Sequence, residues 1–100
     1  MATTEPTVLC KTPTPGKKGT RIAKWKYDCV RKAIRKCTPK NKAGIAFKDV
    51  PKLVEKQLTA EERKTLGSIT WYTVTVKLDM EVSGELSRIA SVKPQHIRRN

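Results

Sequence analysis

The segment between Ser68 and Gly84 constrains the fold of this chain more than any other. Over residues 73–82 apolar and polar side chains alternate strictly, which taken alone is typical of a half-buried strand. As a helix, the same segment has Ser68 as its N-cap, Gly84 as its stop and one apolar face. That face carries Ile69, Tyr72, Val76 and Met80. We expect a helix over 68–83, and the predicted architecture depends on this choice.

Residues 23–37 predict a first helix, because the apolar residues Tyr27, Val30, Ile34 and Cys37 recur at helical spacing. Basic side chains project away from this apolar face. Thr38 precedes a proline and is therefore biased out of the helical region, so the helix ends there and residues 40–43 form a basic loop.

Between these two helices the sequence predicts three short elements. Residues 44–47 are long enough for one small strand only. Asp49 is the expected N-cap of a helix whose apolar face contains Val50, Leu53, Val54 and Leu58. Thr59 and Glu62 have the spacing of a capping box, so a further short helix begins there and stops near Gly67.

After Gly84, residues 85–89 and 95–99 predict two short strands joined by a polar turn that contains Pro94. The expected order is helix, small strand, helix, short helix, long helix and hairpin. This α+β order is that of a winged helix-turn-helix domain, in which the hairpin is the wing. We place this domain at residues 21–100. Residues 1–20 are rich in proline, glycine and threonine and predict a flexible basic arm.

A family resemblance supports this interpretation. The run WYTVTVKLDMEVSGEL from Trp71 to Leu86, followed by Ile97-Arg98-Arg99, resembles an uncharacterised family of small bacterial proteins with a predicted winged-helix fold. The likeness extends to Pro15-Gly16 and to residues 24–39. It implies a helix over 68–83 and transfers no catalytic or ligand residue. Relatives are expected to have an acidic cap where this chain has Ala23, and Thr20 is the nearest substitute.

Charge indicates the class of partner. The chain has 22 Lys and Arg against 9 Asp and Glu, a net charge of +13, which favours nucleic acid as the partner. Residues 1–48 hold 13 basic and 2 acidic residues, residues 49–84 hold 5 and 6, and residues 85–100 hold 4 and 1. The helix expected to read bases is therefore almost neutral. We expect phosphate contacts with weak sequence selectivity, to duplex DNA over RNA.

The predicted contact residues are the cations of the arm, first helix, loop and wing. They are Lys17, Lys18, Arg31, Lys32, Arg35, Lys36, Lys40, Lys42, Arg88, Lys93, Arg98 and Arg99. A second row, Thr70, Thr73 and Lys77, is spaced by three and four residues on the expected outer face of the 68–83 helix. The competing interpretation of both sets is an ordinary solvated surface.

Other classes of function are not indicated. Residues 14–20 lack the preceding strand and the first glycine of a phosphate-binding loop, and the single histidine, His96, has no assigned partner, so we predict no enzyme and no cofactor. The three cysteines contain no CxxC pair, so we expect reduced thiols and no metal site. No apolar run approaches the roughly 18 residues that span a bilayer, so we expect a cytoplasmic protein without membrane contact.

Two alternative functions stay open. A stripe of Trp71, Val74, Leu78 and Val82 forms a homodimer or protein-partner face if it is exposed. The lysine-rich arm is the one clue to an RNA- or ribosome-associated protein. Trp25 lies on the polar side of the first helix, and we prefer packing under the arm to stacking on a base.

Overall fold

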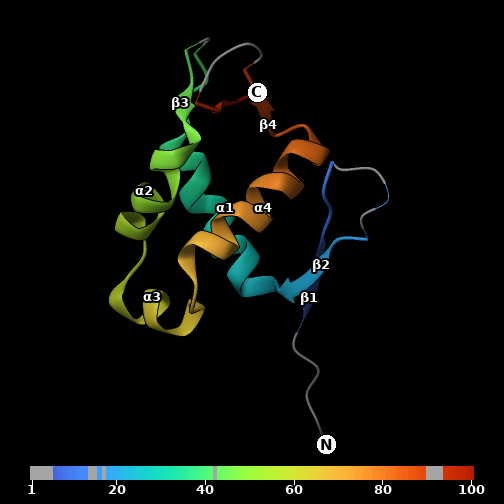
Figure 1. The fold of residues 1–100 in the computed structure, drawn as a ribbon. Helices are drawn as coiled ribbons and strands as arrows, with labels where there is room; N and C mark the ends of the chain where they lie inside the picture. The colour runs from blue at the N-terminus through green and yellow to red at the C-terminus, as the bar shows by residue number, and fades with distance from the viewer. Residues whose placement is uncertain (1–5, 14–15, 17, 42, 90–93) are drawn as a thin grey trace, which may run out of the picture.

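The computed structural model describes residues 6–13, 16, 18–41, 43–89 and 94–100. In these residues four α-helices pack with a two-stranded and a three-stranded antiparallel sheet (Figure 1). The predicted α+β class is confirmed. Each helix in this part of the chain is too short or too polar to cross a membrane.

Helix α4 (Ile69–Ser83) confirms the helix prediction for the decisive segment. The Ser68 hydroxyl accepts a hydrogen bond from the Trp71 N–H at 3.2 Å, and Gly84 follows the helix in the left-handed conformation. The helix crosses the centre of the molecule and packs against α1, α2, β1 and β4 (Figure 1). Its fully buried residues are Thr73, Val76, Lys77 and Met80.

Helix α1 (Lys24–Cys37) buries the apolar side predicted from its spacing. Its first residue follows Ala23, which provides no side-chain cap, and Thr20 lies in a strand, so the proposed Thr20 cap is wrong. The helix ends at Thr38 as predicted. The backbone N–H and the hydroxyl of Thr38 both donate to the Ile34 carbonyl, at 3.0 and 2.8 Å.

Two shorter helices connect α1 to α4. A 3-10 turn, η1 (Phe47–Asp49), continues directly into α2 (Val50–Gln57), so Asp49 is itself helical and its side chain caps nothing. The prediction of an Asp49 cap is therefore wrong. Helix α3 (Ala60–Leu66) begins with the predicted capping box, in which Thr59 and Glu62 exchange hydrogen bonds of 2.8 and 3.1 Å.

The C-terminal sheet contains the predicted small strand and hairpin. Strand β5 (His96–Arg99) lies between β3 (Ile45–Ala46) and β4 (Leu86–Arg88), and both pairings are antiparallel. Ile97 of β5 is fully buried and opposes Ile45 on one side and Arg88 on the other. The pairing of β3 with β5 completes the three-stranded sheet, and β4 at its other edge contacts α4.

The N-terminal segment differs from the predicted flexible arm. Strand β1 (Thr7–Cys10) pairs with β2 (Thr20–Ala23), and Cys10 and Ile22 are buried. The Asp79 carboxylate of α4 accepts the Lys11 N–H at 2.8 Å and the Tyr27 hydroxyl at 2.6 Å, so one side chain joins the residue after β1 to α1 and α4. The remaining residues of the predicted arm, 1–5, 14–15 and 17, lie outside the described residues.

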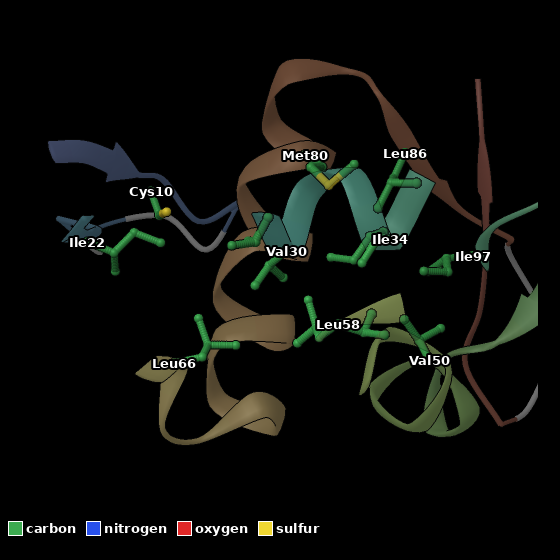
Figure 2. Packing of buried hydrophobic residues seen from close by; sticks show 13 residues of the cluster. Cys10, Ile22, Val30, Ile34, Val50, Leu58, Leu66, Met80, Leu86 and Ile97 are labelled. Atoms are coloured by element: carbon green, nitrogen blue, oxygen red, sulfur yellow. The ribbon is translucent and has the colours of Figure 1, made fainter. Parts of the chain in front are cut away.

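The hydrophobic core is continuous along the molecule. Figure 2 shows it running from Cys10 and Ile22 under the β1–β2 pair to Ile97 of the C-terminal sheet. Val30 and Ile34 of α1 lie in the middle of this row. Each fully buried aliphatic side chain contributes about 1.5–3 kcal/mol to stability. The core therefore fixes the buried side of α1, and with it the direction in which its opposite side points.

Gly44, just before β3, is predicted to tolerate no side chain. Its φ is +61°, and an added Cβ lies 2.5 Å from the Ile97 carbonyl oxygen. Gly84 has a φ of +87°, and a Cβ there meets no described atom within 4 Å, so Gly84→Ala is the matched control. We expect Gly84→Ala to cost about 1 kcal/mol and Gly44→Ala about 3 kcal/mol or more in urea unfolding. If the two variants lose the same free energy of unfolding, the close approach of the Ile97 carbonyl to Gly44 is contradicted.

Candidate nucleic-acid interface

The outward side of α1 carries a concentration of positive charge. The helix contains six Lys and Arg and a single acidic residue, Asp28, which pairs with Lys24. Arg31 and Arg35, like Lys32 and Lys36, are four residues apart and therefore lie on successive turns. Arg35 and Lys36 fall in the last turn, where the helix dipole favours cations. The like charges of Arg31, Lys32, Arg35 and Lys36 repel one another, which is unfavourable for folding.

These side chains line a groove between α1 and the last strand. The groove has a volume of about 550 Å³ and is lined by Asp28, Arg31, Lys32, Arg35, Lys36 and Arg99. A smaller hollow of about 80 Å³ shares Arg35 and Arg99 with it and adds Lys40, Glu85 and Asn100. We call the surface formed by Arg31, Lys32, Arg35, Lys36, Lys40 and Arg99 the basic groove.

Glu85 organises one side of the basic groove. Its carboxylate accepts two hydrogen bonds from Arg31, one of them 2.9 Å from Nε, and one of 3.3 Å from Arg35. The hydrogen bond from Arg31 holds the pKa of Glu85 below its usual value, while partial burial opposes this effect. The two guanidinium groups are thus held in place and partly neutralised.

Lys32 and Lys36 stand apart from this network. Both side chains are exposed, and within the described residues neither forms an ion pair or a side-chain hydrogen bond. Their ammonium groups are therefore available to an anion in the groove. Because a lysine contact acts as a point charge, it sets few geometric requirements on that anion.

The far side of the groove is held by the end of β5. Arg99 donates from Nε to the Thr38 carbonyl at 2.7 Å, and its backbone N–H donates to the Pro39 carbonyl at 2.9 Å. Arg98 reaches the Lys40 carbonyl at 3.5 Å. These bonds attach the C-terminal strand to the end of α1 and bring Arg99, one of the predicted wing cations, beside the cations of α1.

The prediction that Thr70, Thr73 and Lys77 lie on the outer face of α4 is wrong. Thr73 and Lys77 have 0% and 2% exposure, and Thr70 alone of the three is exposed. Lys77 packs over the Phe47 ring at 4.6 Å and pairs with Glu81 at 3.2 Å. Burial lowers the pKa of Lys77, and Glu81 opposes that shift. Since η1 and the C-terminal sheet cover this side of α4, Lys77 is part of the interior.

The other predicted cations are dispersed. Arg88 is exposed but donates from Nε to Glu81 at 2.9 Å, beside buried Lys77. Lys18 is exposed and lines a different hollow together with Cys10, Lys11 and Leu78. Lys17, Lys42 and Lys93 lie outside the described residues. Of the twelve predicted contact cations, the structure brings six together in the basic groove.

The cysteines have the character of structural thiols. Cys10, Cys29 and Cys37 are free. Burial, together with nearby Asp79 for Cys10 and Glu62 for Cys29, raises the pKa of both thiols to about 11. An activated cysteine nucleophile has a lowered pKa instead. In the part of the chain that the structure describes, no three His, Cys, Asp or Glu side chains are grouped to hold a metal ion.

Comparison with known proteins gives a family but no activity. A family model described as a family of unknown function (DUF6958) matches residues 7–97. No curated protein and no solved structure matches the chain. The matched range includes both sheets up to Ile97 and all four helices.

The Glu85 network predicts a pH dependence of stability. Because folding lowers the pKa of Glu85, its contribution is present above its ordinary value of 4.5 and is lost as pH falls through the lowered pKa. We expect Glu85→Gln to lose about 1–2 kcal/mol at neutral pH and to show a shallower decline below pH 4.5 than the wild type.

Urea unfolding at several pH values measures this effect. Glu55→Gln changes charge equally at an exposed position of α2 and is the control. If Glu85→Gln and Glu55→Gln give the same acid profile, the Arg31 and Arg35 contacts do not stabilise the fold.

Proposed function

Because the chain belongs to this family of unknown function, we propose its role from its own surface: it binds nucleic acid through phosphate contacts in the basic groove. The observation that carries the proposal is the gathering of six cations along one groove, against two carboxylates, Asp28 and Glu85. The protein acts as a binding protein rather than an enzyme. Its expected ligand is duplex DNA, which it binds with weak sequence selectivity.

The arrangement of the groove suits a phosphate backbone. Lys32 and Lys36 are separated by about 6 Å along the helix axis at the usual rise per residue. Their flexible side chains follow a charged polymer in more than one register. Arg31 and Arg35 are already ordered by Glu85, so less side-chain freedom is lost when they bind.

A winged-helix fold is part of this proposal. The order α1, β3, α2, α3, α4, β4, β5 and the sheet order β3-β5-β4 support it, with the β4–β5 hairpin as the wing. In helix-turn-helix proteins the recognition helix lies in the major groove. Here the corresponding helix, α4, has its lysine buried, so base readout by that helix is not supported. This is the reason for proposing weak selectivity.

The outer face of α4 favours a second candidate function. Trp71 and Val82 are 45% and 44% exposed, and Val74 and Leu78 are partly exposed between them. An apolar stripe of this kind on a soluble surface is typical of protein contacts. As the alternative, we propose a homodimer or protein-partner module that uses this face.

Removal of Lys32 and Lys36 from the groove should weaken binding. We expect Lys32→Ala with Lys36→Ala to lower affinity for a short labelled duplex and to reduce the slope of log affinity against log salt by about two. Lys52→Ala with Lys56→Ala removes the same charge from exposed positions of α2 and is the control. Fluorescence anisotropy over a range of salt concentrations measures both.

Three results decide between the nucleic-acid hypotheses. Absence of binding to any nucleic acid at low salt rejects the proposal. If the two double variants lose the same affinity, binding depends on the net charge of the protein and not on the basic groove. Tighter binding of structured RNA than of duplex DNA at equal salt supports the RNA-associated hypothesis instead.

The second candidate predicts self-association or partner binding through α4. In its homodimer form, the sedimentation coefficient increases with protein concentration, and Val82→Ser suppresses the increase. Leu9→Ser removes a comparably exposed apolar side chain from β1 and is the control. A monomer at every concentration rejects the homodimer.

A further inference from the structure

Both tryptophans of the chain lie at the surface, one in the first turn of α1 and one in the first turn of α4. Trp25, for which the sequence favoured packing under the N-terminal arm, is 36% exposed, and Trp71 is 45% exposed. The Trp71 ring packs edge-on against Tyr72, with centroids 4.8 Å apart. Tryptophan is on average a highly buried residue, so two exposed rings near the same pair of helix ends call for an explanation.

Lys26 joins the two tryptophan sites. Its Nζ lies 5.6 Å from the Trp25 ring centroid and 5.0 Å from the Tyr72 ring centroid, and it donates to the Tyr72 hydroxyl at 3.2 Å. One ammonium group is thus held between rings of α1 and α4. We call Trp25, Lys26, Trp71 and Tyr72 the aromatic cluster.

The aromatic cluster continues the basic groove along α1. Lys32 follows Trp25 by seven residues and Lys36 by eleven, which are close to two and three helical turns. The three side chains therefore form one row, about 16 Å long at the usual rise per residue. A polymer bound at Lys32 and Lys36 that continues along α1 reaches the Trp25 ring.

We propose that the aromatic cluster is a stacking site for an unpaired nucleobase of the nucleic acid whose phosphates occupy the basic groove. The inference rests on the proposed function and specifies its ligand as nucleic acid with a single-stranded segment. Tryptophan stacks on any base, which agrees with weak sequence selectivity, and stacking with a nearby cation is the usual mode of single-strand binding. Bases paired inside a duplex do not offer their faces in this way.

Charge favours this ligand over a protein. The cluster has an ammonium group at its centre, and the net charge of the chain is +13. A hydrophobic protein surface that covers the cluster leaves the Lys26 charge without water, which is unfavourable unless a carboxylate accompanies it. A single-stranded nucleic acid supplies flat apolar faces and negative charge together.

Intrinsic fluorescence tests the site directly, because both tryptophans of the chain belong to it. The full chain is titrated at equal salt with a single strand of thymidine nucleotides and with a blunt duplex of the same length. We expect the single strand to quench the emission, and the duplex to bind with little quenching.

Trp25→Leu removes a stacking ring and keeps an apolar side chain. We expect it to weaken single-strand binding by about fivefold or more and to leave duplex affinity unchanged. Trp25→Phe should recover part of the loss. Trp71→Leu tests the second ring in the same way. Leu9→Ala, which shortens an exposed apolar side chain of β1, is the control and should change neither affinity. Circular dichroism and urea unfolding confirm that each variant folds.

The outcomes separate this inference from the proposed function. If both leucine variants bind the single strand as the wild type does while the Lys32 and Lys36 double variant is impaired, stacking is rejected and the basic groove stands. If the wild type binds neither oligonucleotide at low salt, both proposals fail. If the leucine variants change only self-association, the cluster is a protein interface and the stacking proposal is rejected.

Discussion

The packing of α1 against α4 is the interaction on which the rest of the structure depends. α4 lies at the centre of the fold and contacts elements from both ends of the chain. Because α1 buries Val30, Ala33 and Ile34 on the inner side, the cations of its C-terminal half point outward. The Glu85 carboxylate emerges just after α4 and meets Arg31 and Arg35 of α1. The same packing that closes the core thus places positive charge on one surface and fixes its orientation.

The central position of α4 also explains its buried charge. Lys77 is enclosed between Phe47 of η1 and Glu81 of its own helix, and Glu81 in turn accepts from Arg88. With the Gln95 amide oriented so that its oxygen faces the cations, it accepts from Lys77 at 3.1 Å. A buried lysine is tolerated only with such partners, and removal of one partner is more costly than replacement of the whole group. The network therefore attaches the C-terminal hairpin to α4, which is a structural role.

The parts of the fold that sequence could predict are those set by neighbouring residues. The Thr59–Glu62 capping box and the Ser68 and Gly84 ends of α4 each need only three or four residues. The pairing of β1 with β2 could not be predicted, because its stability comes from burial of Cys10 and Ile22 against the helices. The basic groove likewise has a part that local sequence predicts and a part that depends on residues distant in the sequence. Periodicity located the cations of α1, whereas their partner Glu85 is 54 residues from Arg31 and had no sequence signal.

The proposed groove and the proposed stacking site depend on different forces, and this difference defines the expected selectivity. Phosphate contacts at Lys32 and Lys36 release counterions, so their contribution falls as salt increases. Stacking on Trp25 is mainly an apolar and dispersion interaction and is screened much less. At low salt the groove dominates, and duplex and single strand are bound alike. As salt increases, the share contributed by the ring grows, so the preference for unpaired bases increases while total affinity decreases. Under these two proposals, a protein with a net charge of +13 distinguishes open from paired nucleic acid without base readout by α4.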